Sequence, residues 1–233
     1  MKTIGIGAPA VDLAVGPDAV WVANGSDGTL SRIDPKVGAV VETIDLRGSN
    51  ELAPNTTFAV AAGAGGVWVG SGEGTVLRLD PATGETVASI DVGGNAVGLA
   101  VGEGAVWAAT VAERVLRIEP RTNTVTAVVP VGVPVSVATG EGGIWLLDTS
   151  DSVWRVDPAT GAVASTFSVG KAPLGVATGR GAVWVALNGD GTVARIDPAT
   201  NKIRAVIALG NPPTDVDVGE GRLWVTVAAE PAT

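Results

Sequence analysis

The sequence predicts an all-β protein with the fold of a β-propeller, and three observations support this prediction. A pattern of about 40 residues recurs along the chain, which is the length of one propeller blade. Each copy contains four short β-type runs separated by turns rich in Gly, Asp and Pro. One tryptophan marks each copy, at intervals of 47, 39, 38, 39 and 40 residues. The series comprises Trp21, Trp68, Trp107, Trp145, Trp184 and Trp224.

The first two strands of each copy are predicted to form a tight hairpin. In residues 97–110 the sequence VGLAVGEGAVWAAT holds two apolar runs joined by a glycine-rich turn. Such a turn supplies the positive backbone φ angles that a short antiparallel connection requires. The second run is apolar at successive positions, which indicates a strand covered on both faces. Its tryptophan is therefore expected to fill the space between neighbouring sheets that diverge outward.

The third strand alternates arginine with apolar residues and ends in Asp-Pro or Glu-Pro, which favours a type I turn into the fourth strand. Pro130 in one fourth strand indicates an outer edge, because proline has no N–H to donate. Trp154, outside the tryptophan series, is expected to pack among apolar neighbours. The repeated arginines are predicted to have a structural role, with their stems covering the adjacent sheet. They are Arg32, Arg78, Arg117, Arg155 and Arg195.

Six blades are expected within a single domain that spans residues 1–233, and five of them are complete. Residues 2–7 align with the fourth strand of other copies, and residues 214–233 supply the first two strands of a further copy. The sixth blade would therefore be shared by the N- and C-termini and be short by one strand. Pairing of the two ends would protect sheet edges that are otherwise open. A deficient sixth blade would also offer an edge for a homo-oligomer.

Composition narrows the classes of partner. A net charge of −9 and a pI near 4.5 argue against nucleic acid as a ligand. No apolar stretch reaches the roughly 18 residues of a membrane-spanning helix, so no membrane insertion is expected. The first residues lack the apolar core of a signal peptide. The absence of cysteine excludes disulfides and thiolate chemistry.

Three aspartates are the candidate ligand-binding residues. Asp12 and Asp215 stand nine residues before the tryptophan of their copies, and Asp217 lies on the same strand face as Asp215. In a closed ring they would gather at the inner strands, where clustered carboxylates need a cation, a proton or water. The cluster predicts a site for Ca²⁺, Mg²⁺ or a cationic ligand, and a water-filled channel lined by solvated acids is the alternative. Ligands are expected at the end of the blades that carries the loops between the second and third strands. Residues 47–57, an insertion at that end, are a second candidate.

Two stretches carry a resemblance to a known family, residues 20–35 (VWVANGSDGTLSRIDP) and residues 181–201 (GAVWVALNGDGTVARIDPATN). These repeats resemble those of bacterial streptogramin-lyase-like propellers and the YVTN/NHL-like group. The resemblance covers essentially the whole chain and implies an extracytoplasmic location as part of a larger protein. It also implies, for the lyases, a catalytic histidine with a glutamate and bound Mg²⁺. This chain has no histidine and no tyrosine, so no residue here takes that role.

Three functions follow as hypotheses. The first is a non-catalytic module that binds a protein or a small molecule. The second is a metal-dependent lyase or lactonase-like hydrolase that uses Asp12, Asp215 and Asp217. The third is a structural module that self-associates through its incomplete sixth blade.

Overall fold

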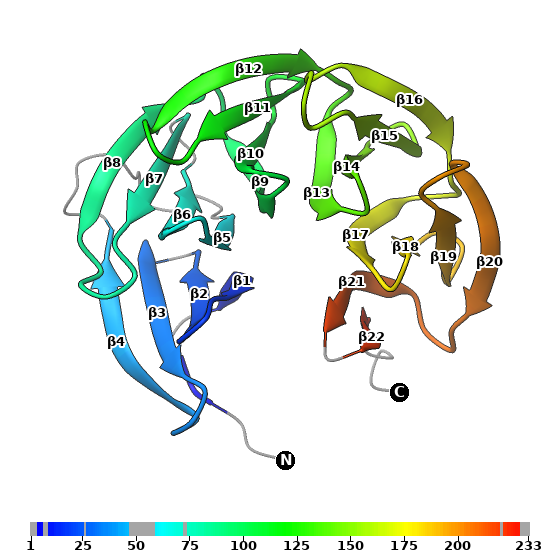
Figure 1. Ribbon diagram of the computed structural model, residues 1–233. Coiled ribbons are helices and arrows are strands. Elements are labelled where there is room, and N and C mark those ends of the chain that lie inside the picture. Colours follow the sequence, from blue (N-terminus) through cyan, green and yellow to red (C-terminus); the bar gives the residue numbers. More distant parts are fainter. Residues whose placement is uncertain are drawn as a thin grey trace. The chain divides into compact units, whose positions relative to one another are not determined.

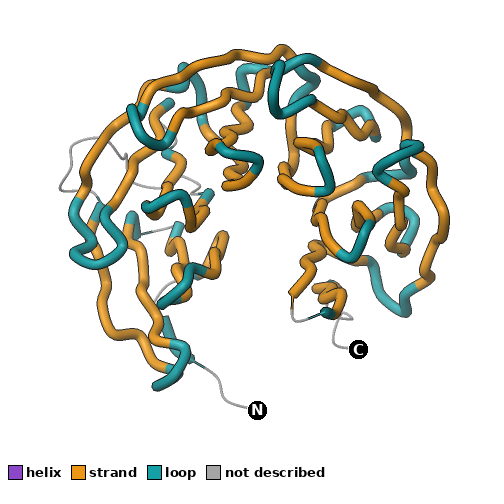
Figure 2. The backbone as a smooth tube through the Cα atoms, in the orientation of Figure 1, coloured by secondary structure: helices purple, strands orange, loops and turns teal. Residues whose placement is uncertain are grey.

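The computed structural model describes residues 4–6, 9–25, 27–46, 59–71, 74–219 and 221–228, and all of its regular elements are strands (Figure 2). Within these ranges no helix has the length and apolar character to cross a membrane. The chain divides into two compact units, Met1–Ala127 and Val128–Thr233, and each is described by itself. The expectation of one domain over residues 1–233 stays a prediction.

The first unit holds three antiparallel sheets of four strands, each paired in chain order (Figure 1). We name them blades 1, 2 and 3. Strand β1 lies beside β5, and β5 beside β9, so the first strands of successive blades are neighbours. The strands are β1 (Ala10–Val15), β2 (Val20–Asn24), β3 (Thr29–Asp34) and β4 (Ala39–Asp45); β5 (Val60–Gly63), β6 (Gly66–Gly70), β7 (Thr75–Leu79) and β8 (Thr86–Asp91); β9 (Ala96–Gly102), β10 (Ala105–Thr110), β11 (Arg114–Glu119) and β12 (Thr124–Pro130).

The second unit holds two four-stranded sheets, blades 4 and 5, and a two-stranded sheet, blade 6. Its first strands are likewise neighbours, β13 beside β17 and β17 beside β21. The strands are β13 (Pro134–Gly140), β14 (Gly143–Asp148), β15 (Ser152–Val156) and β16 (Val163–Ser168); β17 (Pro173–Gly179), β18 (Ala182–Leu187), β19 (Thr192–Asp197) and β20 (Lys202–Ala208); β21 (Pro213–Gly219) and β22 (Arg222–Val227).

In the described residues the sixth sheet contains the two strands predicted from the C-terminal segment and no other. Of the N-terminal segment expected to be its partner, residues 4–6 form no strand, and residues 1–3 and 7 lie outside the described ranges. Strand formation requires a hydrogen-bonded neighbour as well as a suitable sequence. The prediction of five complete blades is confirmed.

The hairpins between first and second strands have the predicted geometry in blades 2 to 5. In blade 3, Glu103 and Gly104 have φ angles of 51° and 75°, as a type I′ turn requires at both central positions. The same pair of positive φ angles recurs at Ala64 and Gly65, with 49° and 71°. Blade 1 differs, because Pro17 stands at the first position and the proline ring holds φ near −65°.

The tryptophans of the series form the cores between blades. Trp68, Trp107 and Trp145 are fully buried, whereas Trp224 in blade 6 is 53% exposed. The indole N–H donates to the carbonyl of the glycine that ends the first strand, at 3.0 Å for Trp68 to Gly63. Equivalent bonds join Trp145 to Gly140 (3.0 Å), Trp184 to Gly179 (3.1 Å) and Trp224 to Gly219 (3.2 Å).

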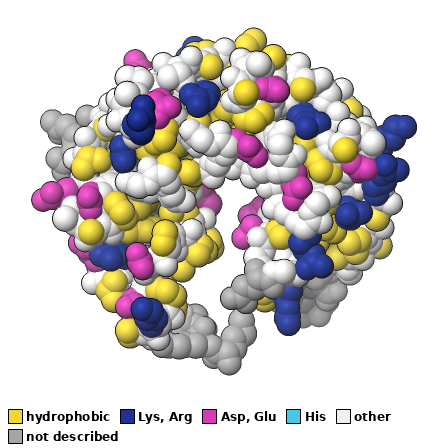
Figure 3. Space-filling model, viewed as in Figure 1, with side chains coloured by type: hydrophobic (Ala, Val, Ile, Leu, Met, Phe, Trp, Pro, Cys, Tyr) yellow, Lys and Arg dark blue, Asp and Glu magenta, His cyan; other side chains and the backbone are white. Residues whose placement is uncertain are grey.

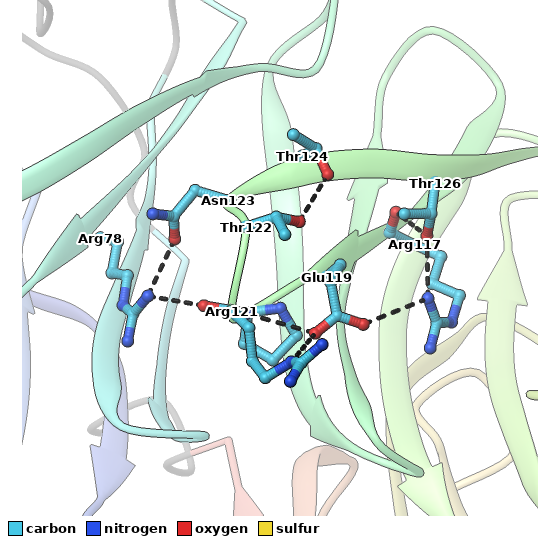
Figure 4. Close-up of polar contacts among 9 residues, drawn as sticks. Arg78, Arg117, Glu119, Arg121, Thr122, Asn123, Thr124 and Thr126 are labelled. Carbon is cyan, nitrogen blue, oxygen red and sulfur yellow. Dashed lines mark hydrogen bonds and ion pairs between the residues drawn. The ribbon is translucent and has the colours of Figure 1, made fainter.

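Three arginines of the third strands, Arg32, Arg78 and Arg155, donate to a carbonyl of the following blade, and Arg78 shows the arrangement. Its guanidinium carbon lies 5.1 Å from the ring centroid of Trp68. Its Nη1 donates to the Pro120 carbonyl at 2.6 Å and to Asn123 Oδ1 at 2.9 Å, both in the turn of blade 3 (Figure 4). Its Nη2 donates to the Gly65 carbonyl at 3.0 Å in its own blade. The arginine therefore has a structural role, as predicted.

Arg155 repeats this arrangement in the second unit. Its guanidinium carbon lies 5.1 Å from the ring centroid of Trp145, and the guanidinium donates to the carbonyls of Pro198 (2.7 Å) and Gly142 (3.2 Å). It also reaches Asn201 Oδ1 at 3.4 Å. Arg78 and Arg155, in different units, thus make equivalent hydrogen bonds. Each donates to one turn carbonyl of its own blade and to two oxygens of the following blade.

Candidate functional site

Asp12, the first candidate residue, lies half-buried on β1 in the first unit. Its Oδ1 accepts a hydrogen bond from the Leu13 N–H at 2.8 Å. Its Oδ2 accepts one from the Val60 N–H, also at 2.8 Å, and Val60 belongs to β5 of blade 2. The carboxylate therefore joins two neighbouring inner strands, which is a structural use of this side chain.

Asp215 and Asp217, the other two candidates, lie on β21 in the second unit. Each accepts a hydrogen bond from the N–H of the residue that follows it, at 2.8 Å and 2.7 Å. The carboxyl of Asp215 lies against the backbone of Gly175, where a side chain would collide with it. Burial of this carboxyl raises its pKa; the Val216 N–H opposes the shift, and the Asp217 carboxylate adds to it. The group is thus held against the sheet although the residue has an exposed surface.

The structure places the three aspartates in two units, Asp12 in the first and the other two in the second. Over the described ranges, no group of three His, Cys, Asp or Glu side chains is arranged to hold a metal ion. A shared site for Ca²⁺ or Mg²⁺ stays a prediction. The candidate insertion at residues 47–57 lies outside the described residues.

Sequence reasoning missed the buried Asp148 at the end of β14, which is 2% exposed. It accepts hydrogen bonds from the Ser150 N–H (2.9 Å), the Ser152 N–H (3.0 Å) and Trp154 Nε1 (2.7 Å). Burial alone would raise the pKa of Asp148, but the bonds from Trp154, Ser152 and Ser150 outweigh it and lower the pKa. The signal was available, since Asp followed by Ser two residues later is typical of a side-chain-capped turn.

A pocket of about 260 Å³ lies in the first unit, between blades 1 and 2. It opens at the ends of the blades that carry the turns from first to second and from third to fourth strand, opposite to the end expected from the sequence. Its walls come from the Pro17–Asp18 turn, the turn of blade 2, and Pro81 and Ala82 after β7. Trp21 and Arg32 supply its indole and guanidinium groups. The departure from the repeat at Pro17 is the sequence signal nearest to this pocket, but alone it indicates a changed hairpin and not a cavity.

Comparison with known proteins gives the fold. No protein-family model and no curated protein matches the chain. Among solved structures, the chain is similar to the structure of streptogramin B lyase, with a TM-score of 0.79 and 15% sequence identity. The similarity covers 95% of this chain and 78% of that one. At this level of identity the likeness concerns the fold, so the chain is an all-β propeller of six blades, and over the residues that the structure describes five have four strands and one has two.

Proposed function

We propose that the chain is a non-catalytic β-propeller module that binds a protein or a small molecule as a part of a larger protein. The observation that carries this proposal is the engagement of Asp12, whose two oxygens both accept main-chain N–H groups. A general base needs an oxygen directed at the substrate, and this carboxylate has both oxygens directed at the sheet. With no His, Tyr or Cys in the sequence, a histidine base and a cysteine or tyrosine nucleophile are lacking.

The charge distribution supports a partner other than nucleic acid. The chain carries a net charge of −9, and acidic and basic side chains are interspersed on the face shown in Figure 3. A nucleic-acid surface would instead gather Lys and Arg. We also propose that the chain does not insert into a membrane. Its resemblance to streptogramin-lyase-like repeats supports a location outside the cytoplasm.

One observation favours catalysis as a second candidate. The raised pKa of Asp215, beside Asp217, is a property that enzymes use for proton transfer. A metal-dependent lyase or lactonase-like hydrolase would hold Ca²⁺ or Mg²⁺ at these carboxylates, and the ion would polarise the substrate carbonyl.

Turnover assays separate the two candidates. We expect the full chain to hydrolyse neither p-nitrophenyl acetate nor a γ-lactone in millimolar Ca²⁺ or Mg²⁺, and its melting temperature to stay unchanged. The control is the triple variant Asp12→Asn, Asp215→Asn and Asp217→Asn, with its folded fraction checked by circular dichroism. Metal-dependent turnover in the parent that the folded variant lacks would refute the non-catalytic proposal.

The incomplete blade 6 favours self-association as a third candidate. Trp224 and Val227 on β22 are 53% and 45% exposed, whereas the other tryptophans of the series are at most 9% exposed. Because the binding module needs no second copy, we expect a monomer in sedimentation velocity at all concentrations. A concentration-dependent dimer that the Trp224→Ser substitution dissociates would favour the structural module instead.

A further inference from the structure

The pocket between blades 1 and 2 contains an arginine that lacks partners which Arg78 and Arg155, its equivalents in blades 2 and 4, have. Within the described part of the chain, the guanidinium of Arg32 makes two polar contacts, both through Nη1. They are a 3.3 Å hydrogen bond to the Ala82 carbonyl and a 3.6 Å ion pair with Glu42 Oε2. Arg78 and Arg155 instead donate through both terminal nitrogens to three oxygens each. Arg32 therefore presents Nη2 with no acceptor in these ranges.

Compared with blades 2 and 4, two substitutions in the repeat coincide with the missing acceptors. The first is at the hairpin of blade 1, where Pro17 prevents the positive φ angle of the other hairpins, so the carbonyl that meets Nη2 in blades 2 and 4 is not presented. The second is Gly84, which stands where blades 3 and 5 have Asn123 and Asn201. Glycine offers no side-chain oxygen, so the amide acceptor of the next blade is lost as well.

A second donor in the same pocket, Nε1 of Trp21, has no partner in the described residues. Nε1 of Trp107 also has none although its hairpin is regular, but it is buried and does not line this pocket. Four tryptophans of the series donate their indole N–H to the glycine that ends the first strand. Trp21 makes no such bond to Gly16, or to any other residue in the ranges that the structure covers. Its Nε1 lies beside Gly16, since a Cβ added there would be 3.5 Å away, and both residues line the pocket. The guanidinium carbon of Arg32 lies 5.6 Å from the Trp21 ring centroid.

The charges around the pocket select a neutral ligand. Glu42 already neutralises Arg32, and Asp18 adds a negative charge at the pocket wall, so an anion would meet two carboxylates. The oxygens missing from blade 1 are those of a backbone carbonyl and a side-chain amide, both neutral. Pro17, Ala62 and Pro81 supply apolar wall, and about 260 Å³ suits a compact ligand.

We propose that this pocket binds a neutral amide carbonyl attached to a compact apolar body of about the size of a proline ring. The carbonyl oxygen accepts hydrogen bonds from Arg32 Nη2 and Trp21 Nε1, and the apolar body contacts Pro17 and Pro81. The amide belongs either to a free small molecule or to a peptide segment of a partner. None of the three candidate aspartates lines this pocket, so its test is independent of the test of the non-catalytic proposal.

Nuclear magnetic resonance of the ¹⁵N-labelled full chain tests the site, with the indole N–H signal of Trp21 assigned through Trp21→Phe. Titration with N-acetyl-L-prolinamide is expected to shift this signal saturably, with a dissociation constant on the order of 1 mM, while the indole signals of Trp145 and Trp184 stay in place. Acetylated Ala-Pro-Ala-amide distinguishes the two sources: tighter binding than the single residue indicates a peptide, and weaker binding a small molecule. A shift with sodium acetate and none with either amide would overturn the proposal, since the pocket would then be an anion site.

A hairpin exchange provides the matched variants. The triple substitution Pro17→Glu, Asp18→Gly and Ala19→Gly gives blade 1 the Gly-Glu-Gly-Gly hairpin that blade 4 has at residues 140–143, where the indole of Trp145 and the guanidinium of Arg155 both find their carbonyls. It should restore the bond from Trp21 to Gly16, keep or raise the melting temperature, and weaken amide binding at least tenfold. Arg180→Glu changes the same hairpin position in blade 5 and should leave binding unchanged.

Arg32→Lys keeps the positive charge but removes the forked donor, so it should also weaken amide binding. This single substitution keeps the test decisive if the hairpin variant does not fold. Binding by folded Arg32→Lys or hairpin variants that equals the parent's would overturn the assignment.

Discussion

Replacing Trp145 by alanine is expected to lower the free energy of unfolding of the second unit by about 4 kcal/mol, the range found for large aromatic truncations in cores. The side chain is fully buried and packs with Val176 and Val183 of the next blade. Its N–H bond to the Gly140 carbonyl and the face that it presents to Arg155 are lost together with the apolar contacts. Denaturation in urea, followed by circular dichroism, measures the loss.

Trp224→Ala is the matched control for this substitution. Trp224 occupies the same position of the repeat and makes the same bond to its glycine, but it is 53% exposed. We expect it to cost less than about 1 kcal/mol, as for substitutions away from a packed core. Equal losses in the two variants would show that repeat position, and not burial between blades, determines the contribution of the tryptophan.

Asp148→Ala is expected to destabilise the protein by about 3 kcal/mol. The substitution leaves the N–H groups of Ser150 and Ser152 and the indole N–H of Trp154 without their acceptor inside the protein. It also opens a space beside Gly132, whose backbone lies against the carboxylate. Urea denaturation at neutral pH measures the effect, and Asp217→Asn, a change at an exposed aspartate, serves as the control.

The lowered pKa of Asp148 gives this contribution a defined pH dependence. A carboxyl whose pKa is lower in the folded than in the unfolded protein stabilises the fold above its unfolded value of about 3.9. The contribution disappears as the pH falls below that value towards the folded pKa. The difference in unfolding free energy between the parent and Asp148→Asn should therefore shrink between about pH 5 and pH 3. A difference that stays constant over this interval would contradict the assignment.

Most of the fold could be predicted because the signals that specify a blade are local. The strands and hairpins around Trp68, Trp107, Trp145 and Trp184 depend on apolar runs and turns within a few residues of each tryptophan. The N-terminal segment was the exception, since its described residues 4–6 form no strand. Its sequence matches a fourth strand, but a strand also needs a neighbour, and alignment of one repeat with another does not supply it.

The pocket could not be predicted, because it results from three positions that are distant in sequence. Pro17 changes one hairpin, Gly84 lacks an amide that its equivalents carry, and Arg32 lies between them with fewer acceptors. Each departure is unremarkable alone, and only their proximity in the first unit exposes two donors to one cavity. Asp148 was missed for a related reason: Trp154 was expected to pack, and its bond to Asp148 depends on the register that pairs Trp154 with Leu146.

The arginine bond from one blade to the next favours the addition of whole blades by duplication. Arg78 donates to the turn of the following blade, and Arg155 does the same two blades later. A duplicated unit therefore brings a donor for its successor and an acceptor for its predecessor at the same time. A tandem copy inserted between two existing ones would meet matching chemistry at both junctions, which allows an array of this kind to lengthen by whole units during evolution.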